Sequence, residues 1–424
     1  MLYYFIKTLQ QGTSNFQGNN MKQTKHIVIG GAGAGGLAAG YGLAEAGFDV
    51  VVLEKLPQHF QAQSGLKGGL SRRHGGAFYA GLPQVADEIR RKTGSLYDIP
   101  NAVKQVGAIY FVRKQDRPFI ISGWQEAQIP FHEDNSYTSL LNPDFSKQNG
   151  IKAYITFDQI IDTDLLGNFL KSNFESKGKL EFVKKVIGSE IYKKEIKAII
   201  GKSPEGEKHY PCDLWINITG AWQDEVERCV NPDADHIMPD FFGWTATPVW
   251  RRPWNWNDWS SRPTILQFYG IFNSPLLKQL AIMPVVESLG NNMVAISMTD
   301  ESKVFHPDDF YESLSLRYEE NRVTLEYKCN ELQNLLYQGL KHNMKTAYDP
   351  DSISWCVKSF LIHPEVKHRS PRVDWGSQFP AVIPMYRYFG GVKNSIVASP
   401  GKLGFVMEFR DKIVKEVSQF FESE

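Results

Sequence analysis

The strongest constraint in this sequence is a glycine-rich segment at residues 25–55, KHIVIGGAGAGGLAAGYGLAEAGFDVVVLEK. Residues 26–29 form a short β-branched apolar run, which predicts a buried strand, and Gly31, Gly33 and Gly36 follow in the order G-x-G-x-x-G. Gly31 permits a tight turn, Gly33 leaves room for a diphosphate beside the backbone, and Gly36 lets a helix pack closely on the strand. This pattern predicts the phosphate-binding turn of a dinucleotide-binding fold.

The residues after the glycines continue the pattern. Residues 37–46 predict a helix, whose unpaired first-turn amides and positive dipole end favour a diphosphate lying over residues 33–36. Gly47 ends this helix, residues 49–53 predict a second parallel strand, and Glu54 stands at the end of that strand, at the spacing of the ribose-binding carboxylate. Together these features favour a ligand-binding turn over a glycine-rich loop without a ligand.

Glu54 limits the choice of dinucleotide. Its carboxylate can accept hydrogen bonds from the hydroxyls of an adenosine ribose, whereas a 2'-phosphate would meet like charge, which disfavours NADP. Of FAD and NAD, NAD fits less well, because residues 56–83 are a long glycine-rich stretch instead of the next strand and helix of a dehydrogenase. FAD is the predicted cofactor, and the residues expected to contact it here are Gly31, Gly33, Ala34, Gly35, Gly36, Glu54 and Lys55.

Composition disfavours several other classes of protein. At 424 residues, the chain suits one large domain or two interleaved domains. Its 47 basic and 47 acidic residues balance, which favours a small-molecule substrate over nucleic acid or an acidic membrane. The 4 cysteines contain no C-x-x-C pair and the 10 histidines no H-E-x-x-H motif, so neither a disulfide framework nor a metal site is predicted. A reducing, cytoplasmic location fits this cysteine usage.

The first residues differ in character from the rest of the chain. Residues 1–24 begin with a short apolar run and then become polar, which is too little for a signal segment or a membrane-spanning helix. We expect a disordered leader here, with Met21 as an alternative start of the protein. No later run reaches membrane-spanning length, and the sequence leaves the oligomeric state open.

A second motif lies at residues 71–79, with the sequence Ser-Arg-Arg-His-Gly-Gly-Ala-Phe-Tyr. It resembles the segment that passes the flavin ring in the D-amino-acid oxidase superfamily of FAD-dependent oxidoreductases, nearest to the glycerol-3-phosphate and L-2-hydroxyglutarate dehydrogenase branches. The resemblance implies that FAD is contacted by Ser71, His74, Gly75 and Gly76. Three roles stay open for His74: contact with the flavin, a covalent bond to it, or a place in an inert loop.

Two later segments resemble the same superfamily. Residues 212–222 predict a buried strand ending in Gly-Ala-Trp, and residues 395–405 predict a strand and a glycine-rich turn that lead into a closing helix at 407–421. By the resemblance, the first segment runs beside the flavin diphosphate, and the start of the closing helix stabilises negative charge on the flavin ring. The further cofactor contacts that we expect are Val186, Gly220, Ala221, Trp222, Gly401, Leu403 and Gly404.

The predicted fold class is α/β. We expect a Rossmann-like FAD-binding domain of the glutathione reductase type, with three layers, and an inserted antiparallel-sheet α+β substrate domain. The FAD-binding domain is expected to comprise residues 25–95, 151–225 and 369–424, and the substrate domain residues 96–150 and 226–368. The other predicted elements are helices at 83–93 and 307–340, a helix within 157–176 that Asp162 or Thr163 can cap, strands at 106–114, 180–186, 190–200, 264–268 and 293–298, and short strands and loops at 115–150.

The resemblance implies a flavin-dependent oxidation. We expect the protein to oxidise a C–H bond next to an amine or hydroxyl group of a small amino or hydroxy acid, by hydride transfer to FAD, with His74 near the flavin. An arginine is expected to bind the substrate anion, and the candidates are Arg72, Arg73, Arg252 and Arg372. Arg372 departs from the superfamily, because the usual Asp-Gly-Pro does not follow it. Residues 241–272 gather tryptophans and arginines, which fits either an aromatic substrate cavity or a packed sheet edge.

Two other functions stay open. Flavin-dependent amine oxidases, desaturases and hydroxylases share the same first strand-helix-strand unit. A non-catalytic binding protein that keeps the fold is the second alternative, and the intact glycines together with Glu54 argue against it.

Overall fold

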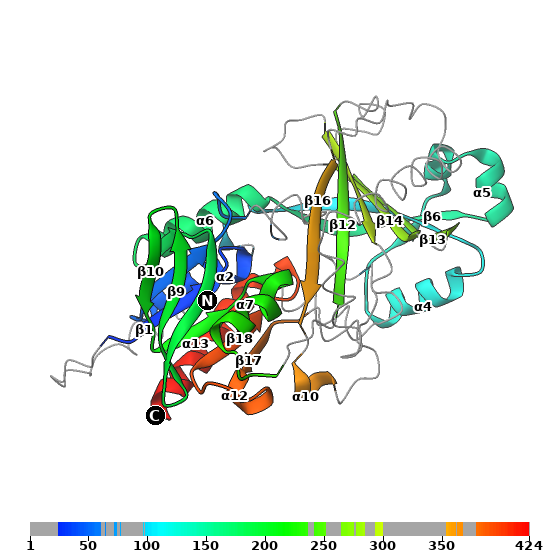
Figure 1. Cartoon of the computed structure of the whole chain (residues 1–424). Coiled ribbons are helices and arrows are strands. Elements are labelled where there is room, and N and C mark those ends of the chain that lie inside the picture. The colour runs from blue at the N-terminus through cyan, green and yellow to red at the C-terminus, as the bar shows by residue number, and fades with distance from the viewer. Residues whose placement is uncertain are drawn as a thin grey trace, which may run out of the picture.

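This computed structural model describes residues 24–60, 64, 72–73, 77, 96, 98–235, 241–251, 264–274, 277–284, 293–299, 353–361, 363–367 and 379–423. Figure 1 shows a sheet covered by helices on one side of the molecule and a second group of long strands, including β12 and β16, on the other. The predicted leader up to residue 23 and the predicted helices at 83–93 and 307–340 lie outside the described residues.

Within the described residues, six strands form a mostly parallel sheet in the order β17-β18-β11-β1-β2-β7. In that order their bounds are Ala381–Pro384, Ser395–Ser399, Leu214–Asn217, His26–Gly30, Asp49–Glu54 and Lys179–Phe182. The pairings of β1 with β2 and β11, of β11 with β18 and of β2 with β7 are parallel, whereas β17 runs antiparallel to β18. A mostly parallel sheet needs cover on both faces, and this sheet has it.

Helices cover one face of this sheet. They are α2 (Ala34–Glu45), α6 (Thr163–Glu175) and α13 (Val406–Glu422), and α2 packs against both of the others. The α6 helix begins where the sequence predicts, because the Asp162 carboxylate accepts hydrogen bonds from the amides of Asp164 and Leu165, at 3.1 and 3.0 Å. Ile27 and Ile29 of β1 are buried in the same apolar cluster as these helices.

A small sheet covers the other face. It consists of the antiparallel strands β8 (Lys185–Tyr192), β9 (Glu195–Ser203) and β10 (Gly206–Pro211), and α7 (Gln223–Val230) packs against β8. Val28, which points away from Ile27 and Ile29, is buried in a second apolar cluster together with residues of this sheet. The predicted three-layer arrangement is therefore confirmed.

The second large sheet contains the predicted antiparallel strands. Among the described residues it has nine strands, eight of them in the order β16-β12-β15-β14-β13-β4-β6-β3, with β5 (His132–Glu133) paired to β6. In that order the eight are Ile353–Phe360, Phe241–Arg251, Met293–Thr299, Leu277–Pro284, Thr264–Ser274, Val103–Val112, Lys152–Ile161 and Arg72–Arg73. The strands predicted at 264–268 and 293–298 are β13 and β15, and both run antiparallel to β14. The β13–β4 pair is parallel.

Some element boundaries differ from the predicted ones. The strand β6, at residues 152–161, pairs with β4 in the nine-stranded sheet, although the predicted division at 150/151 grouped it with the FAD-binding segments. Residues 180–186, predicted as one strand, are divided between β7 and β8 in two different sheets. Residues 190–200 are interrupted by a two-residue turn, in which Lys193 and Lys194 have positive φ. Alternating apolar residues do not report which sheet a strand joins.

Residues 115–150 contain helices that the sequence did not predict. The α4 helix spans Arg117–Glu126 and α5 spans Pro143–Asn149, with a 3-10 helix at Asn135–Leu140 between them. Both α-helices have a proline in their first turn, where its missing amide costs nothing. The fully buried Trp124 anchors α4, and its indole N–H donates to the carbonyl of Ala77 at 2.7 Å. The sequence prediction was wrong here because it counted these prolines, together with the scattered Gly and Asn, as loop signals, whereas two of them stand at helix starts.

The Glu181 carboxyl group on β7 should make the free energy of unfolding depend on pH in the acidic range. Burial raises its pKa, but hydrogen bonds from Lys179, Lys208 and Tyr210 outweigh this effect and hold the pKa at about 2. Because the folded-state pKa lies below the unfolded value, the stabilisation is complete above that value and is lost as the pH falls from about 4.5 to about 2. Glu181→Gln should remove this part of the free energy of unfolding.

Urea unfolding at a series of acidic pH values tests the expectation. Wild-type protein should lose stability across this range more steeply than the Glu181→Gln variant. The control is Glu126→Gln, which removes an exposed carboxylate at the end of α4. A Glu181→Gln variant with the wild-type pH profile would contradict the assignment.

Candidate functional site

The predicted cofactor segments meet at one edge of the six-stranded sheet. Because β1, β11 and β18 are parallel, their carboxyl ends lie at the same edge, and each is followed by one of the predicted glycine-containing turns. Gly31–Gly36 follow β1, Gly220–Trp222 follow β11, and Gly401–Gly404 follow β18. Ligands of open α/β sheets bind at such carboxyl edges. Segments about 370 residues apart in sequence thus meet at this edge.

The first turn shows why glycine is needed at two of its positions. Gly31 has a φ of +96°, and its amide donates to the carbonyl of Leu53 at 2.7 Å, which joins the turn to the end of β2. A Cβ on Gly36 would lie 1.7 Å from the carbonyl oxygen of Gly31. Only a glycine at position 36 lets α2 begin this close to the end of β1.

The amino end of α2 is open to an anion. Gly33 is the N-cap residue and provides no side-chain cap, and no acidic residue lies in the first turn. The amide of Ala34 donates to Ser64 Oγ at 2.8 Å, and a Cβ on Gly33 would meet the same oxygen at 2.9 Å. Beyond the Ala34 amide, which Ser64 holds, the first-turn amides and the positive end of the helix dipole fit a diphosphate.

The Glu54 carboxylate is held by the backbone of the same turn. Its Oε2 accepts a hydrogen bond from the amide of Ala32 at 2.6 Å, and its Oε1 accepts one from the amide of Leu56 at 2.8 Å. A carboxylate offers about four acceptor positions, so capacity remains for ribose hydroxyls. Glu54 is half-buried, whereas Lys55 beside it is exposed.

The second and third turns approach the first. A Cβ on Gly35 would lie 2.8 Å from Pro400, which directly follows β18, and 2.9 Å from Ile218, which directly follows β11. Gly220 and Gly401 have positive φ values of +61° and +67°. The chain therefore turns sharply after both strands, as the predicted roles of Gly220 and Gly401 require.

The side chains in these turns are differently exposed. Ala221 and Gly404 are buried, whereas Trp222 and Leu403 are half-buried. Val186, on β8, is buried in the apolar cluster that also contains Leu53, so it lies behind the end of β2.

Only part of the predicted flavin-facing segment is described. Arg72 and Arg73 form β3, which pairs with Ile160 and Gln159 of β6 and contacts the 3-10 helix Leu403–Phe405. This contact brings β3 to the turn that follows β18. The other predicted residues of the segment and the substrate site lie outside the described residues: Ser71, His74, Gly75, Gly76, Arg252 and Arg372.

Two polar side chains of the site were not predicted. Ser64 lies in the glycine-rich stretch after Glu54, and nothing in its sequence context separates it from neighbouring serines. Gln223 follows Gly-Ala-Trp directly, and its amide nitrogen donates to the carbonyls of Asn217 and Ala398 at 3.1 and 2.6 Å. Its position after the motif was visible in the sequence, but the partner strand, 175 residues later, was not.

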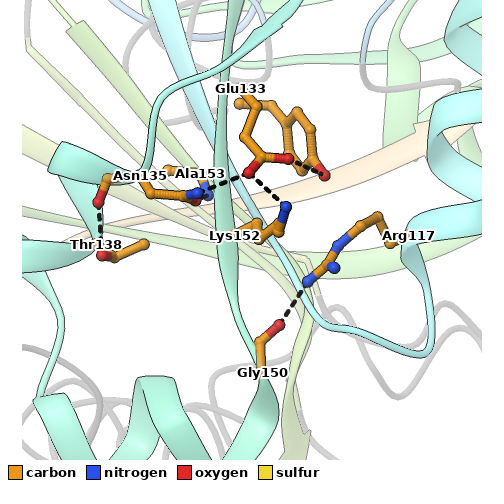
Figure 2. Close-up of polar contacts among 8 residues, drawn as sticks. Arg117, Glu133, Asn135, Thr138, Gly150, Lys152 and Ala153 are labelled. Atoms are coloured by element: carbon orange, nitrogen blue, oxygen red, sulfur yellow. Dashed lines mark hydrogen bonds and ion pairs between the residues drawn. The ribbon is translucent and has the colours of Figure 1, made fainter.

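A separate groove lies against the nine-stranded sheet. Its volume is about 510 Å³, and it is lined by Arg117, Pro118, Ile121, Ser122, Gln125, Phe131, Glu133 and Tyr154. Figure 2 shows its charged residues engaged with protein groups: Glu133 accepts from Lys152 at 2.5 Å, and Arg117 donates to the carbonyl of Gly150 at 2.6 Å. None of the predicted cofactor or substrate residues lines this groove.

Other site chemistries find no support in the described part of the chain. No cluster of His, Cys, Asp or Glu there could hold a metal ion. Cys212 and Cys229 are free thiols, and burial raises the pKa of Cys212 to about 12, so this thiol is protonated near neutral pH. No described helix has the length and apolar character needed to cross a membrane.

Comparison with known proteins gives one family. A family profile described as FAD dependent oxidoreductase (DAO) matches residues 26–279, which is more than half of the chain. No curated protein sequence matches.

Solved structures share the fold at low sequence identity. L-proline dehydrogenase from P. horikoshii is 14% identical with a TM-score of 0.54, and the match covers 94% of each chain. NikD, described as an unusual amino acid oxidase, is 14% identical with a TM-score of 0.60, and the match covers 92% of this chain and 94% of NikD. Glycerol-3-phosphate dehydrogenase from Bacillus halodurans, complexed with FAD, is 13% identical with a TM-score of 0.57, and the match covers 95% of this chain and 66% of that chain.

Proposed function

The chain belongs to the family of FAD-dependent oxidoreductases, and on this basis we propose that it oxidises a C–H bond next to an amine or hydroxyl group of a small amino or hydroxy acid. FAD, when bound, accepts the hydride. The observation that carries the proposal is the meeting of three glycine-containing turns and the Glu54 carboxylate at one edge of a parallel sheet. Fold neighbours named for proline, an amino acid and glycerol-3-phosphate support a small anionic substrate.

Different groups of the described residues bind different parts of FAD in this proposal. The open amino end of α2 binds the diphosphate, and the free acceptor positions of Glu54 bind the adenosine ribose. Glycines 220, 401 and 404 let the main chain approach the flavin half, with Trp222 at the edge of its pocket. Val186 and Lys55 complete the predicted set on the adenosine side, near the end of β2.

Among the described residues, Arg72 and Arg73 of β3 are the candidates for binding the substrate anion. The contact between β3 and Leu403–Phe405 supports a position beside the flavin half of the site. A guanidinium can bind a carboxylate through two parallel hydrogen bonds, which fixes its orientation as well as its charge. Arg252 and Arg372 stay as sequence-based candidates.

Steady-state assays with amino acids, hydroxy acids and amines test the proposed reaction. We expect turnover of one class of acid and loss of turnover when its carboxylate is converted to an amide, because the arginine then lacks its partner. Turnover of amines alone would favour the alternative amine oxidase function. A protein that binds FAD and oxidises none of these compounds would support the non-catalytic alternative.

We propose that His74 contacts the flavin, because it directly follows β3 in sequence. His74→Ala should then change the absorbance spectrum of the bound flavin without preventing FAD binding. Acid precipitation of the wild-type protein separates contact from covalent attachment. Yellow colour in the supernatant is the expected result, colour retained in the pellet would show a covalent bond, and a variant spectrum identical to wild type would remove His74 from the site.

We propose a cytoplasmic location because the cysteines form no disulfide pattern in the sequence. Cys212 and Cys229 support this proposal, because both are free thiols. The proposed partner is a small-molecule substrate, and the balanced charge of the chain supports this over nucleic acid.

A further inference from the structure

One side-chain amide joins the ends of two strands that lead into the site. The last residue pair in the ladder between β11 and β18 is Asn217 with Val397. Beyond it, Gln223 Nε2 donates to the carbonyl of Asn217 at 3.1 Å and to the carbonyl of Ala398 at 2.6 Å. Gln223 is 6% exposed, so both bonds are shielded from water. Its amide group thus adds one cross-link after the main-chain ladder has ended.

Asn217 holds the turn that follows β11. Its amide nitrogen donates to the carbonyl of Gln223 at 2.8 Å and to Glu227 Oε2 at 3.1 Å. Its amide oxygen accepts from the N–H and the hydroxyl of Thr219, at 3.2 and 2.7 Å. The two donors and the acceptor oxygen of this fully buried amide are therefore all engaged.

Glu227 joins the same two strands one turn later on α7. Its carboxyl group accepts hydrogen bonds from Trp215 Nε1 on β11 at 3.0 Å and from the Ser395 hydroxyl on β18 at 2.5 Å. Asn231 contributes a longer bond at 3.4 Å. Burial raises the pKa of Glu227, and these donors oppose that shift. The α7 helix is thus fixed to both strands by buried polar groups.

The two turns depend on this spacing. Gly220 and Gly401 turn the chain by positive φ shortly after the cross-linked residues, and no main-chain pair between β11 and β18 holds them together there. The residues that follow the two strands, Ile218 and Pro400, both approach the start of α2, at 2.9 and 2.8 Å from the position of a Cβ added to Gly35. A change in the distance between the strand ends would therefore shift the position of the flavin half of the pocket relative to the diphosphate half.

We propose that Gln223, supported by Asn217 and Glu227, is a positioning residue that fixes the distance between the two flavin-facing turns. The inference rests on the proposed placement of FAD, with its diphosphate at α2 and its flavin ring at the turns after β11 and β18. It predicts that loss of the cross-link changes the binding of the flavin half and leaves the binding of the adenosine diphosphate half unchanged.

The fold contains a matched control at the opposite end of the same strands. Asn394 lies immediately before β18, is 3% exposed, and donates through Nδ2 to the carbonyls of Ile196 and Asp213, both at 2.9 Å. Asp213 lies immediately before β11. Gln223→Met and Asn394→Leu each replace a buried bridging amide by an apolar side chain of similar size and leave two buried carbonyls without that donor. Asn394→Leu also leaves the amide of Ile196 without its acceptor, now at 2.8 Å, so the control is at least as disruptive as the test variant.

The experiment compares these variants in the full-length protein. Both should lower the urea midpoint of the FAD-free protein. Gln223→Met alone should weaken FAD binding at least tenfold, keep the wild-type affinity for ADP, and shift the flavin midpoint potential. If the affinity for one redox form of FAD falls tenfold more than the affinity for the other, the midpoint potential shifts by about 30 mV for a two-electron couple.

Each outcome decides the proposal. The proposal would be overturned if Gln223→Met kept the wild-type FAD affinity and flavin midpoint potential. It would also be overturned if Asn394→Leu changed these two quantities as much as Gln223→Met does. If Gln223→Met does not fold, Gln223→Asn replaces it, because the amide is kept but is one methylene too short to bridge both carbonyls. None of these readouts needs a substrate, so failure of the proposed reaction is seen separately, in the substrate assays.

Discussion

Gly36→Ala is expected to weaken FAD binding at least 100-fold, equivalent to about 2.7 kcal/mol. The added Cβ would lie 1.7 Å from the carbonyl oxygen of Gly31 and 2.9 Å from its carbonyl carbon. Both are backbone atoms, so no side chain can move aside. Gly31 is also fixed at the other side, because its amide donates to Leu53. The start of α2 must therefore move away from β1.

The same clash should destabilise the protein without its cofactor. Overpacking of a tightly packed site costs roughly 1–3 kcal/mol, and contact with backbone atoms places Gly36→Ala at the upper end. Urea unfolding of FAD-free protein measures this loss, and flavin fluorescence titration measures the affinity. Glycine is required at position 36 because of this close packing and not because of backbone conformation, since the φ of Gly36 is not positive.

Gly107→Ala is the matched control for this substitution. Gly107 lies within β4, nothing lies within 4 Å of its added Cβ, and its φ is not positive. Its stability should stay at or slightly above the wild-type value, because alanine restricts the unfolded chain more than glycine does. Wild-type affinity for FAD in Gly36→Ala, or an equal loss in Gly107→Ala, would show that the close approach of α2 to β1 does not shape the site.

The sequence predicts the first strand-helix-strand unit well because its signals are local. The strand, the glycines, the helix and Glu54 fall within about thirty residues, a complete unit in which each residue type has a separate physical reason. The structure confirms β1, α2 and β2, and it places Glu54 beside the turn. The closing strand and helix were similarly visible, because an apolar run, a turn and an amphipathic pattern follow one another.

The missed features depend on partners that are distant in sequence. β6 was not predicted as a strand, and only its pairing with β4 places it in the nine-stranded sheet. Gln223 resembles an ordinary first-turn helix residue, and its role is visible only when Ala398 is brought alongside. Periodicity reports the face that a residue presents to its surroundings, and it contains no information on which distant segment supplies the contact.

The α4 helix was missed for another reason. Its turn residues on either side, together with isolated aromatics, resemble the composition of loops. Tertiary packing decides this case, because the fully buried Trp124 stacks edge-on with Tyr110 of β4 at 5.4 Å between ring centroids. A short helix gains more from one such anchor than from intrinsic propensity.

Glu54→Gln is expected to weaken FAD binding by about 100-fold, within the roughly 1.5–3 kcal/mol typical of hydrogen bonds to charged groups. Glutamine has one acceptor oxygen, so its NH₂ group would face the amide of either Ala32 or Leu56, both of which now donate to Glu54. One amide of the turn would lose its acceptor, and the ribose would lose a charged partner. FMN lacks the adenosine ribose, so its affinity should change much less.

The comparison of FAD with FMN separates ribose binding from general damage to the fold. Titration of both flavins into Glu54→Gln should show a selective loss for FAD, and direct titration should show a loss of similar size for ADP, which also carries the adenosine ribose. Glu45→Gln is the matched control, since it removes a carboxylate at the far end of α2 whose nearest cation, Lys177 Nζ, is 3.9 Å away. Both flavins should bind it normally. If Glu54→Gln weakened FMN and FAD equally, Glu54 would act on the shape of the turn alone, and the selection of an adenosine ribose would have to be carried by other residues.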